Sequence, residues 1–136
     1  MDYIPYCHQV QYYETDMMGV AHHANYIHWM EEARVDFMDQ LGFPYGGMER
    51  AGIVSPVTKL ACEYKHPSTF GDVVTVIVSV AELGGASLTI GYLMKKEDGT
   101  TVLEGTSRHV FTDKEGRILR LKRDLPEFYA ALEEQL

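Results

Sequence analysis

Hydrophobic residues change their spacing once along the chain, from a helical period to the alternation of strands. Between residues 24 and 41, apolar side chains recur at intervals of three and four, namely Ile27, Met30, Phe37, Met38 and Leu41. This spacing is typical of a helix that buries one face. Gly42 follows the last of these residues and Pro44 lies just beyond, so we expect the helix to end there.

The part of the chain after the helix alternates between apolar and polar residues. This alternation predicts strands within residues 53–65, 74–80, 88–94 and 102–111. The turn sequences HPSTFGD, ELGGAS, EDGT and DKEG separate or follow them, and such short connections favour antiparallel neighbours. A further strand is predicted before the helix, within residues 3–13. We expect residues 45–47 to form a loop and residues 124–136 a short helix.

These elements predict an α+β fold in one domain, residues 1–136. The helix has one apolar stripe, and the sheet is the only large apolar surface that can cover it. We therefore expect an antiparallel sheet of about five strands to wrap around one long helix. Exposed edges of Val-rich strands, such as residues 73–80, promote aggregation unless they are paired or covered. This predicts a homo-oligomer.

Composition narrows the function classes. The chain has 136 residues, of which 46% are apolar and 24% charged, as in ordinary soluble domains. A net charge of -8 does not favour nucleic-acid binding, and no apolar run is long enough to insert into a membrane. The N-terminus lacks the pattern of a signal peptide. Cys7 and Cys62 fit no pairing motif, so we expect free thiols and a cytoplasmic location.

The densest polar chemistry lies in YYETDMMGVAHHANY, residues 12–26, where the helix begins. Asp16 stands among Tyr12, Tyr13, Met17 and Met18, which we expect to line an apolar cleft. Taken alone, such an Asp more often forms a turn or a helix cap, although its seven-residue distance from His23 is too long for a local cap. In a cleft, its carboxylate would be poised as a general base or a nucleophile.

The start of the helix supplies the complementary half of a reaction centre. The first backbone N–H groups of a helix have no partners within it, and the helix dipole favours negative charge at that end. A carbonyl oxygen placed there would be stabilised as it becomes an oxyanion. A carboxylate opposite a helix N-terminus is therefore suited to acyl transfer or hydrolysis.

The neighbouring polar residues allow more than one interpretation. His22 and His23 belong to no metal-ligand motif of known spacing, so we expect no metal ion and no other cofactor. His23 is either a packed histidine or a residue that positions substrate or water. Asn25 is expected to cap the helix, with support of a catalytic group as the alternative. His8, His66 and His109 carry no partner signal and are expected to be structural.

The spacing of these residues resembles the hot-dog-fold acyl-CoA thioesterases of the 4-hydroxybenzoyl-CoA thioesterase and YbgC-like family. The shared residues are Tyr12, Asp16, Gly19, Val20, His23, Asn25 and Tyr26. Glu31 to Arg34 is similar to that family's ERAR segment, HPSTFGD to its P…GD turn, and LPEFYAAL to its C-terminal helix. The similarity covers nearly the whole chain in order. YETD stands where those enzymes usually have EDTD, and Met17 and Met18 replace two small residues.

The resemblance implies a function and a set of site residues. Asp16 corresponds to the family's catalytic carboxylate, the backbone amide of His23 to the donor that polarises the thioester carbonyl, and the side chains of Tyr12 and His23 to further catalytic groups. We expect contacts with the substrate from Met17, Gly19, Val20, Asn25 and Tyr26. The resemblance also implies dimers that often pair into tetramers, with the site between subunits, and we favour the tetramer here.

The activity that follows is hydrolysis of an acyl-CoA thioester to a free acid and coenzyme A. Asp16 would either attack the carbonyl directly or activate a water molecule, and the sequence leaves both routes open. Two other functions fit the same residues. One is a hydratase or dehydratase acting on acyl thioesters, with His23 paired to Asp16. The other is a non-catalytic module that binds or senses acyl-CoA.

Overall fold

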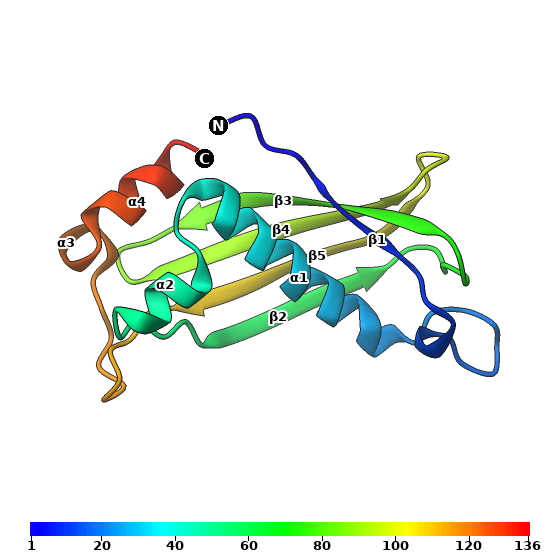
Figure 1. Ribbon diagram of the computed structural model, residues 1–136, viewed down its shortest axis with the longest axis horizontal. Helices are drawn as coiled ribbons and strands as arrows, with labels where there is room; N and C mark the ends of the chain where they lie inside the picture. The colour runs from blue at the N-terminus through cyan, green and yellow to red at the C-terminus, as the bar shows by residue number, and fades with distance from the viewer.

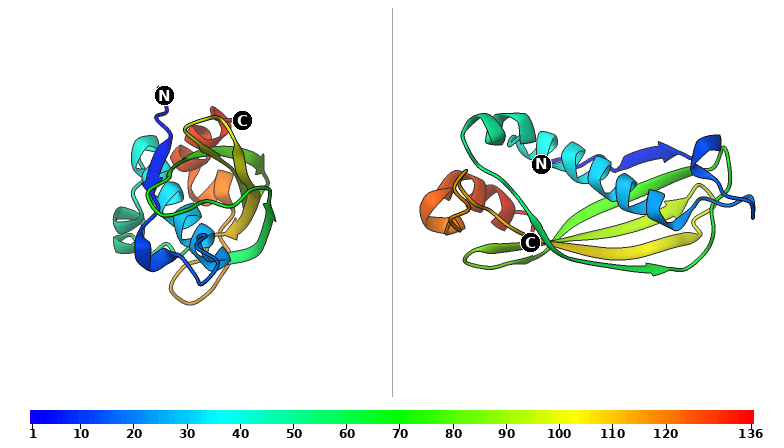
Figure 2. Two further views of the ribbon diagram at one scale, coloured as in Figure 1. Left: turned by 90° about the vertical axis from the view of Figure 1, so that its right-hand side faces the viewer. Right: turned by 90° about the horizontal axis from the view of Figure 1, so that it is seen from below.

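Helix α1 (His23–Leu41) lies along the concave side of an antiparallel sheet in the computed structural model, which describes residues 1–136 (Figure 1). The strands are β1 (Tyr6–Gln9), β2 (Val57–Tyr64), β3 (Val73–Leu83), β4 (Ser87–Lys96) and β5 (Thr101–Val110). Their order across the sheet is β1-β3-β4-β5-β2. Figure 2 shows the sheet curling around the helix. The predicted α+β architecture, the hot-dog fold, is confirmed.

Short helices occupy both ends of the strand region. A 3-10 turn (Tyr12–Glu14) precedes α1, and α2 (Tyr45–Arg50), α3 (Leu121–Asp124) and α4 (Pro126–Glu133) lie near the C-terminal end of α1 (Figure 1). The prediction of a loop at residues 45–47 was wrong, because this segment is the start of α2. The predicted strands within 3–13 and 53–65 exist but are shorter than expected.

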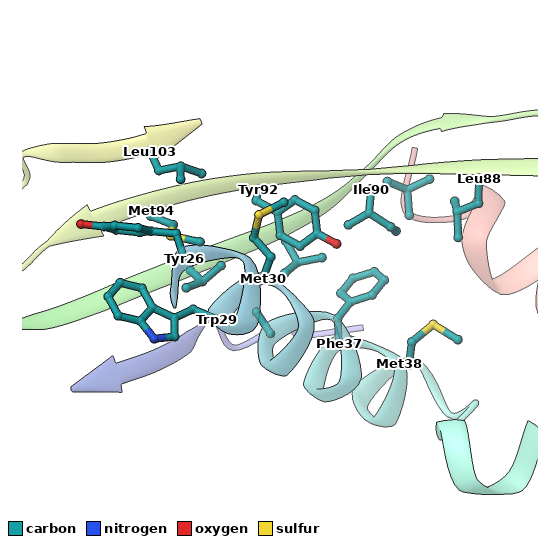
Figure 3. Packing of buried hydrophobic residues seen from close by; sticks show 14 of the residues in the cluster. Tyr26, Trp29, Met30, Phe37, Met38, Leu88, Ile90, Tyr92, Met94 and Leu103 are labelled. Carbon is teal, nitrogen blue, oxygen red and sulfur yellow. The ribbon is translucent and has the colours of Figure 1, made fainter. Parts of the chain in front are cut away.

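The core forms between one face of α1 and the inner face of the sheet. Side chains from the helix point at those of β4 and β5 in Figure 3. Trp29, Met30 and Phe37 are almost fully buried, as are Val74, Val76, Ile90 and Met94 on the strands. The helix ends at Gly42, whose φ of 98° is a left-handed conformation that favours glycine.

The sheet edges are not those expected from the sequence. Strand β3 pairs with β4 along its length and with β1 at residues 73–76, so the first half of its Val-rich segment is not an edge. The edge next to β5 is β2, whose residues are all exposed except Cys62, which is half-buried. Helix α1 packs most closely on β1 and β3, which leaves the inner face of β2 partly uncovered.

Gly105 of β5 allows β2 and the helix to approach closely. It is paired with Cys62, whose Sγ lies 3.7 Å from Sδ of Met30 on α1. A Cβ atom at Gly105 would stand 2.8 Å from the backbone oxygen of Ala61 and 3.5 Å from Cε of Met30. A backbone oxygen in a ladder cannot move aside as a flexible side chain can, so the position requires glycine.

Gly105→Ala should therefore lower the melting temperature, with a cost of about 1–3 kcal/mol, the range for overpacked cores. Gly47→Ala in α2 is the matched control, because a Cβ there would make only ordinary contacts, with Pro44 at 3.6 Å and Arg50 at 3.9 Å, and alanine favours a helix. Thermal unfolding followed by circular dichroism measures both. A Gly105→Ala variant that melts at or above the wild-type temperature would contradict this account.

Candidate active site

The loop that precedes α1 is held in place by Glu14, which is only 6% exposed. Its carboxylate accepts hydrogen bonds from Nε2 of His8 at 2.7 Å, from the backbone N–H of Gln11 at 2.8 Å and from Nε1 of Trp29 at 2.7 Å. Its carbonyl oxygen accepts two more, from the backbone N–H of His22 and from Nδ2 of Asn25. One residue thus ties together β1, the loop and the first turns of the helix.

Burial alone would raise the pKa of Glu14, because it penalises the charged form. The hydrogen bonds from His8, Gln11 and Trp29 outweigh that effect and hold the pKa of this carboxyl below its usual value. Glu14 is therefore ionised at neutral pH and serves as an acceptor. His8 also contacts Glu32, at 3.2 Å, which agrees with the structural role expected for this histidine.

Asp16 lies in a tight turn two residues further on and is exposed. Its carbonyl oxygen accepts from the N–H of Gly19 at 2.9 Å, and its own N–H donates to Val20 at 3.0 Å. The side-chain Oδ1 accepts from the N–H of Met18 at 2.8 Å, while Oδ2 accepts no hydrogen bond within the chain. One carboxylate oxygen of Asp16 therefore stabilises the turn, as the turn interpretation predicts. The other oxygen has no partner and is available for chemistry.

The turn brings Asp16 back towards the start of the helix. Thr15 and Ala21 form an antiparallel bridge across its base, and Gly19 has a φ of 79°, which allows the chain to reverse. Val20 pairs with Thr69, which anchors the returning arm to the segment before β3. Gly19 and Val20 therefore shape the loop, a role distinct from the substrate contacts expected of them.

The expected apolar cleft around Asp16 is not formed by a single chain. Four large side chains of the loop point outward, namely Tyr12, Tyr13, Met17 and Met18, which are 75%, 78%, 105% and 82% exposed. The physical reason is that Glu14 takes the inward position of this loop. Tyr12 instead lies against Phe70, with ring centroids 5.8 Å apart.

The N-terminus of α1 is capped by His22, whose Nδ1 accepts from the N–H of Ala24 at 3.2 Å. The prediction that Asn25 caps the helix was wrong, because its side chain is bonded to Glu14. The backbone N–H of His23 donates no hydrogen bond within the chain. The ring of His23 is exposed and lies beside the ring of His22. The backbone carbonyl oxygen of His23 accepts a hydrogen bond from the hydroxyl of Tyr64 at 3.1 Å.

A cavity of about 270 Å³ opens at this helix end. It is lined by Ala21, His23, Tyr26, Tyr64, Lys65, His66 and Pro67. Tyr26 is 3% exposed, and its hydroxyl is bonded to Oγ of Ser68 at 2.6 Å, so it contributes a fixed wall. Of the predicted site residues, only His23 and Tyr26 line this cavity. The others lie outside its lining, namely Tyr12, Asp16, Met17, Gly19, Val20 and Asn25.

A metal site and a membrane-spanning helix would each require a recognisable structural feature. No group of three or more His, Cys, Asp or Glu side chains is arranged to hold a metal ion. No helix is long and apolar enough to cross a membrane. The loop offers a carboxylate oxygen without a partner, and the helix N-terminus offers a backbone N–H without a partner. Attack on a carbonyl group uses groups of these two kinds.

Comparison with known proteins agrees with this chemistry. A model of the thioesterase-like superfamily matches residues 10–136, and the chain belongs to that superfamily. It is 34% identical over 126 residues, 92% of this chain and 91% of the relative, to the putative acyl-CoA thioesterase YneP of Bacillus subtilis. It is 32% identical over 81 residues, 59% of this chain and 60% of the relative, to the acyl-CoA thioesterase YbgC of Haemophilus influenzae.

Among solved structures, the DHNA-CoA thioesterase of Staphylococcus aureus superposes with a TM-score of 0.90 at 32% identity. The match covers 96% of this chain and 88% of that one. The resemblance to YbgC-like thioesterases seen in the sequence is thereby confirmed, and the chain is a thioester hydrolase.

Sequence reasoning missed Glu14 as the residue that organises the loop. The signal was present, because Gln11 and Glu14 are three residues apart and form a reciprocal capping box around the 3-10 turn. Gln is a rare first member of such a box, and the indole donor of Trp29 lies fifteen residues away, so the pattern predicted neither the burial nor the partners.

Glu14→Gln should lower the free energy of unfolding at neutral pH by about 1.5–3 kcal/mol, the range for hydrogen bonds to charged groups. Because the folded state lowers the pKa of Glu14, the ionised side chain stabilises the fold above the pKa of an unfolded glutamate. That contribution is lost as the pH falls through the lowered pKa. Urea unfolding across the acid range should therefore show a weaker pH dependence in the variant.

Glu97→Gln, at an exposed position, is the matched control and should keep the wild-type pH dependence. If Glu14→Gln and the wild type lose stability in parallel as the pH falls, Glu14 is not the group responsible.

Proposed function

We propose that this protein hydrolyses acyl-CoA thioesters to a free carboxylic acid and coenzyme A, with Asp16 as the reacting carboxylate. The observation that carries the proposal is that Oδ2 of Asp16 and the backbone N–H of His23, seven residues apart at the two ends of one loop, both lack a hydrogen-bond partner within the chain. The names of YneP, YbgC and the DHNA-CoA thioesterase support acyl-CoA as the substrate class.

The reaction follows from these two groups. The thioester oxygen accepts from the N–H of His23, where the helix dipole favours the growing negative charge. In one route Oδ2 of Asp16 attacks the carbonyl carbon, coenzyme A leaves as the thiolate, and water then hydrolyses the mixed anhydride. In the other, Asp16 takes a proton from a water molecule that attacks directly. Both routes regenerate the carboxylate and use one water molecule.

The remaining predicted residues have supporting roles in this proposal. Met17 and Tyr12 present exposed apolar surface next to Asp16 and would contact the substrate. Asn25 and Tyr26 hold the helix end through Glu14 and Ser68. Cys7 and Cys62 are free thiols, which supports the cytoplasm as the location of the protein.

A second copy of the chain completes the site in this proposal. Strand β2 is an open edge, and the large apolar residues Val57, Leu60 and Tyr64 on it are each more than 40% exposed. Such an edge is a template for pairing with another strand. Pairing there would cover apolar surface and exclude water from the helix mouth. We propose a dimer that pairs further into a tetramer.

Release of free thiol from a panel of acyl-CoAs, followed with a thiol reagent, tests the function. Thiol release is expected from at least one member of the panel. Binding of acyl-CoA without release would favour the sensing module, and hydration of enoyl-CoA without release would favour the hydratase.

Asp16→Asn should lower kcat at least about 100-fold, because an amide can neither attack as a nucleophile nor accept a proton efficiently. The fold should be unaffected, since Oδ1 still accepts from Met18. Asp39→Asn, at an exposed position on α1, is the matched control for loss of a negative charge. Near wild-type kcat in a folded Asp16→Asn protein would remove Asp16 from the mechanism.

His23→Ala should reduce kcat less than Asp16→Asn does. The polarising group at this position is the backbone N–H, which the substitution retains, whereas the exposed ring contributes only contacts. Steady-state kinetics of the two variants on one substrate give the comparison. A larger loss in His23→Ala would make the imidazole a primary catalytic group.

The protein should sediment as a dimer or a tetramer at micromolar concentration. Leu60→Lys on β2 should weaken this association, because it places a charge on the open edge. Lys59→Glu, on the opposite face of the same strand, is a control for a change of charge alone. A fully active wild-type monomer would contradict both the assembly and the shared site.

A further inference from the structure

Arg34 is a cation of the protein interior without an acidic partner. It is half-buried on α1, and no ion pair of the chain includes it. Its Nε donates to the hydroxyl of Tyr45 at 2.8 Å and its Nη1 to the hydroxyl of Tyr92 at 2.8 Å. Both partners are neutral, so the positive charge is not compensated. A charge removed from water is costly unless it is paired, which makes this arrangement unusual for a purely structural residue.

Tyr92, one of the two tyrosines that contact Arg34, is held in place by further hydrogen bonds. Tyr92 oxygen accepts from Arg34, so its O–H is free to donate to Oγ of Ser107 at 2.6 Å, and Ser107 in turn donates to Nε2 of His109 at 2.7 Å. Burial, followed by the charge of Arg34, lowers the pKa of His109 to about 4, so the ring is neutral. The network therefore adds no negative charge and holds the guanidinium in one orientation.

One edge of the guanidinium remains available. Nη2 of Arg34 makes no hydrogen bond within the chain. The only buried side-chain nitrogen or oxygen without a partner is Nδ1 of His109, so Nη2 is reached from the surface. An arginine that presents free N–H groups beside fixed hydroxyls is well suited to a carboxylate, which accepts from Arg in a forked geometry.

The position of Arg34 relates it to the thioester. His23, Ile27, Met30 and Arg34 follow helical spacing and share one side of α1. This side faces β2, since Tyr64 bonds to His23 and Cys62 contacts Met30. Leu60 of β2 is paired with Ser107, next to the network of Arg34. We call this strip between α1 and β2 the α1–β2 seam.

The α1–β2 seam is apolar along its length and charged at its end. Ile27, Leu60 and Tyr64 are 38%, 41% and 48% exposed. From His23 to Arg34 the helix advances about 16 Å, and side chains on a helix lean towards its N-terminus, which shortens that span. An extended acyl chain whose carbonyl lies at the N–H of His23 would therefore end near Arg34.

We propose that Arg34 selects acyl groups that end in a carboxylate, so that the preferred substrates are coenzyme A thioesters of dicarboxylic acids. This inference rests on the proposed function, because it takes the helix mouth as the position of the thioester carbonyl. The methylene chain lies along the α1–β2 seam, and the distal carboxylate accepts from Nη2 of Arg34. Tyr45 and Tyr92 are positioning residues that hold the guanidinium.

The experiment compares acyl-CoAs of equal length with and without the distal carboxylate, namely sebacoyl-CoA with decanoyl-CoA and suberoyl-CoA with octanoyl-CoA. The wild type should show a higher kcat/KM for the dicarboxylic member of at least one pair. In Arg34→Met this ratio should fall roughly 10- to 100-fold, the equivalent of a lost hydrogen bond to a charged group, mainly through KM. Arg34→Lys should retain part of the preference, and Arg120→Met, at an exposed position, should retain all of it.

Each outcome decides the proposal separately from the proposed function. Hydrolysis of both members at equal kcat/KM by the wild type overturns the role of Arg34 and leaves the thioesterase function in place. A change in sedimentation of Arg34→Met without a change in the ratio also overturns it, and makes Arg34 the partner of an acid on another subunit. If no acyl-CoA releases thiol, the proposed function fails, and calorimetric binding of the same pairs tests the role of Arg34. Tighter binding of sebacoyl-CoA than of decanoyl-CoA by the wild type, lost in Arg34→Met, supports the inference. Equal binding of the two overturns it.

Discussion

The geometry of the loop before α1 depends on one buried carboxylate. An ionised side chain leaves water at a high cost unless donors replace the lost hydration, and Glu14 is supplied by an imidazole, a backbone amide and an indole. These donors come from β1, from the loop and from the helix. Their common acceptor therefore sets the distance between segments that are far apart in the sequence, and it fixes the turn that carries Asp16.

Two acids in the same loop thus have opposite roles because their surroundings differ. Glu14 points inward, and its hydrogen bonds leave it no capacity for chemistry. Asp16 points outward, and only one of its oxygens is engaged. The reacting carboxylate of the proposed mechanism needs a fixed position and a free oxygen; Glu14 provides the position, and Asp16 keeps the oxygen.

The sequence predicted the helix and the strands, because these depend on local periodicity, and it pointed to residues 12–26 as the candidate site from the residue types near a helix start. It did not predict which strands form the edges, since the order β1-β3-β4-β5-β2 follows from long-range pairing. It placed Asn25 at the cap instead of His22, because both residue types can accept from a backbone amide and only the bond from Asn25 to Glu14 separates them. The network of Arg34 joins residues as far apart as positions 34 and 109, which no local pattern reveals.

The exposed apolar side chains next to Asp16 have a physical explanation in the chemistry proposed for the loop. Four large exposed residues on one short loop exceed the scattered apolar exposure of ordinary surfaces. In water, the N–H of His23 would polarise a carbonyl only weakly, since a high dielectric constant reduces every electrostatic interaction. Apolar groups that are covered by substrate or by a second chain exclude water and so strengthen that polarisation. The single chain therefore exposes apolar surface at Asp16 and along β2, and in the proposed mechanism substrate and a second chain cover it, so that assembly and substrate binding serve the same catalytic requirement.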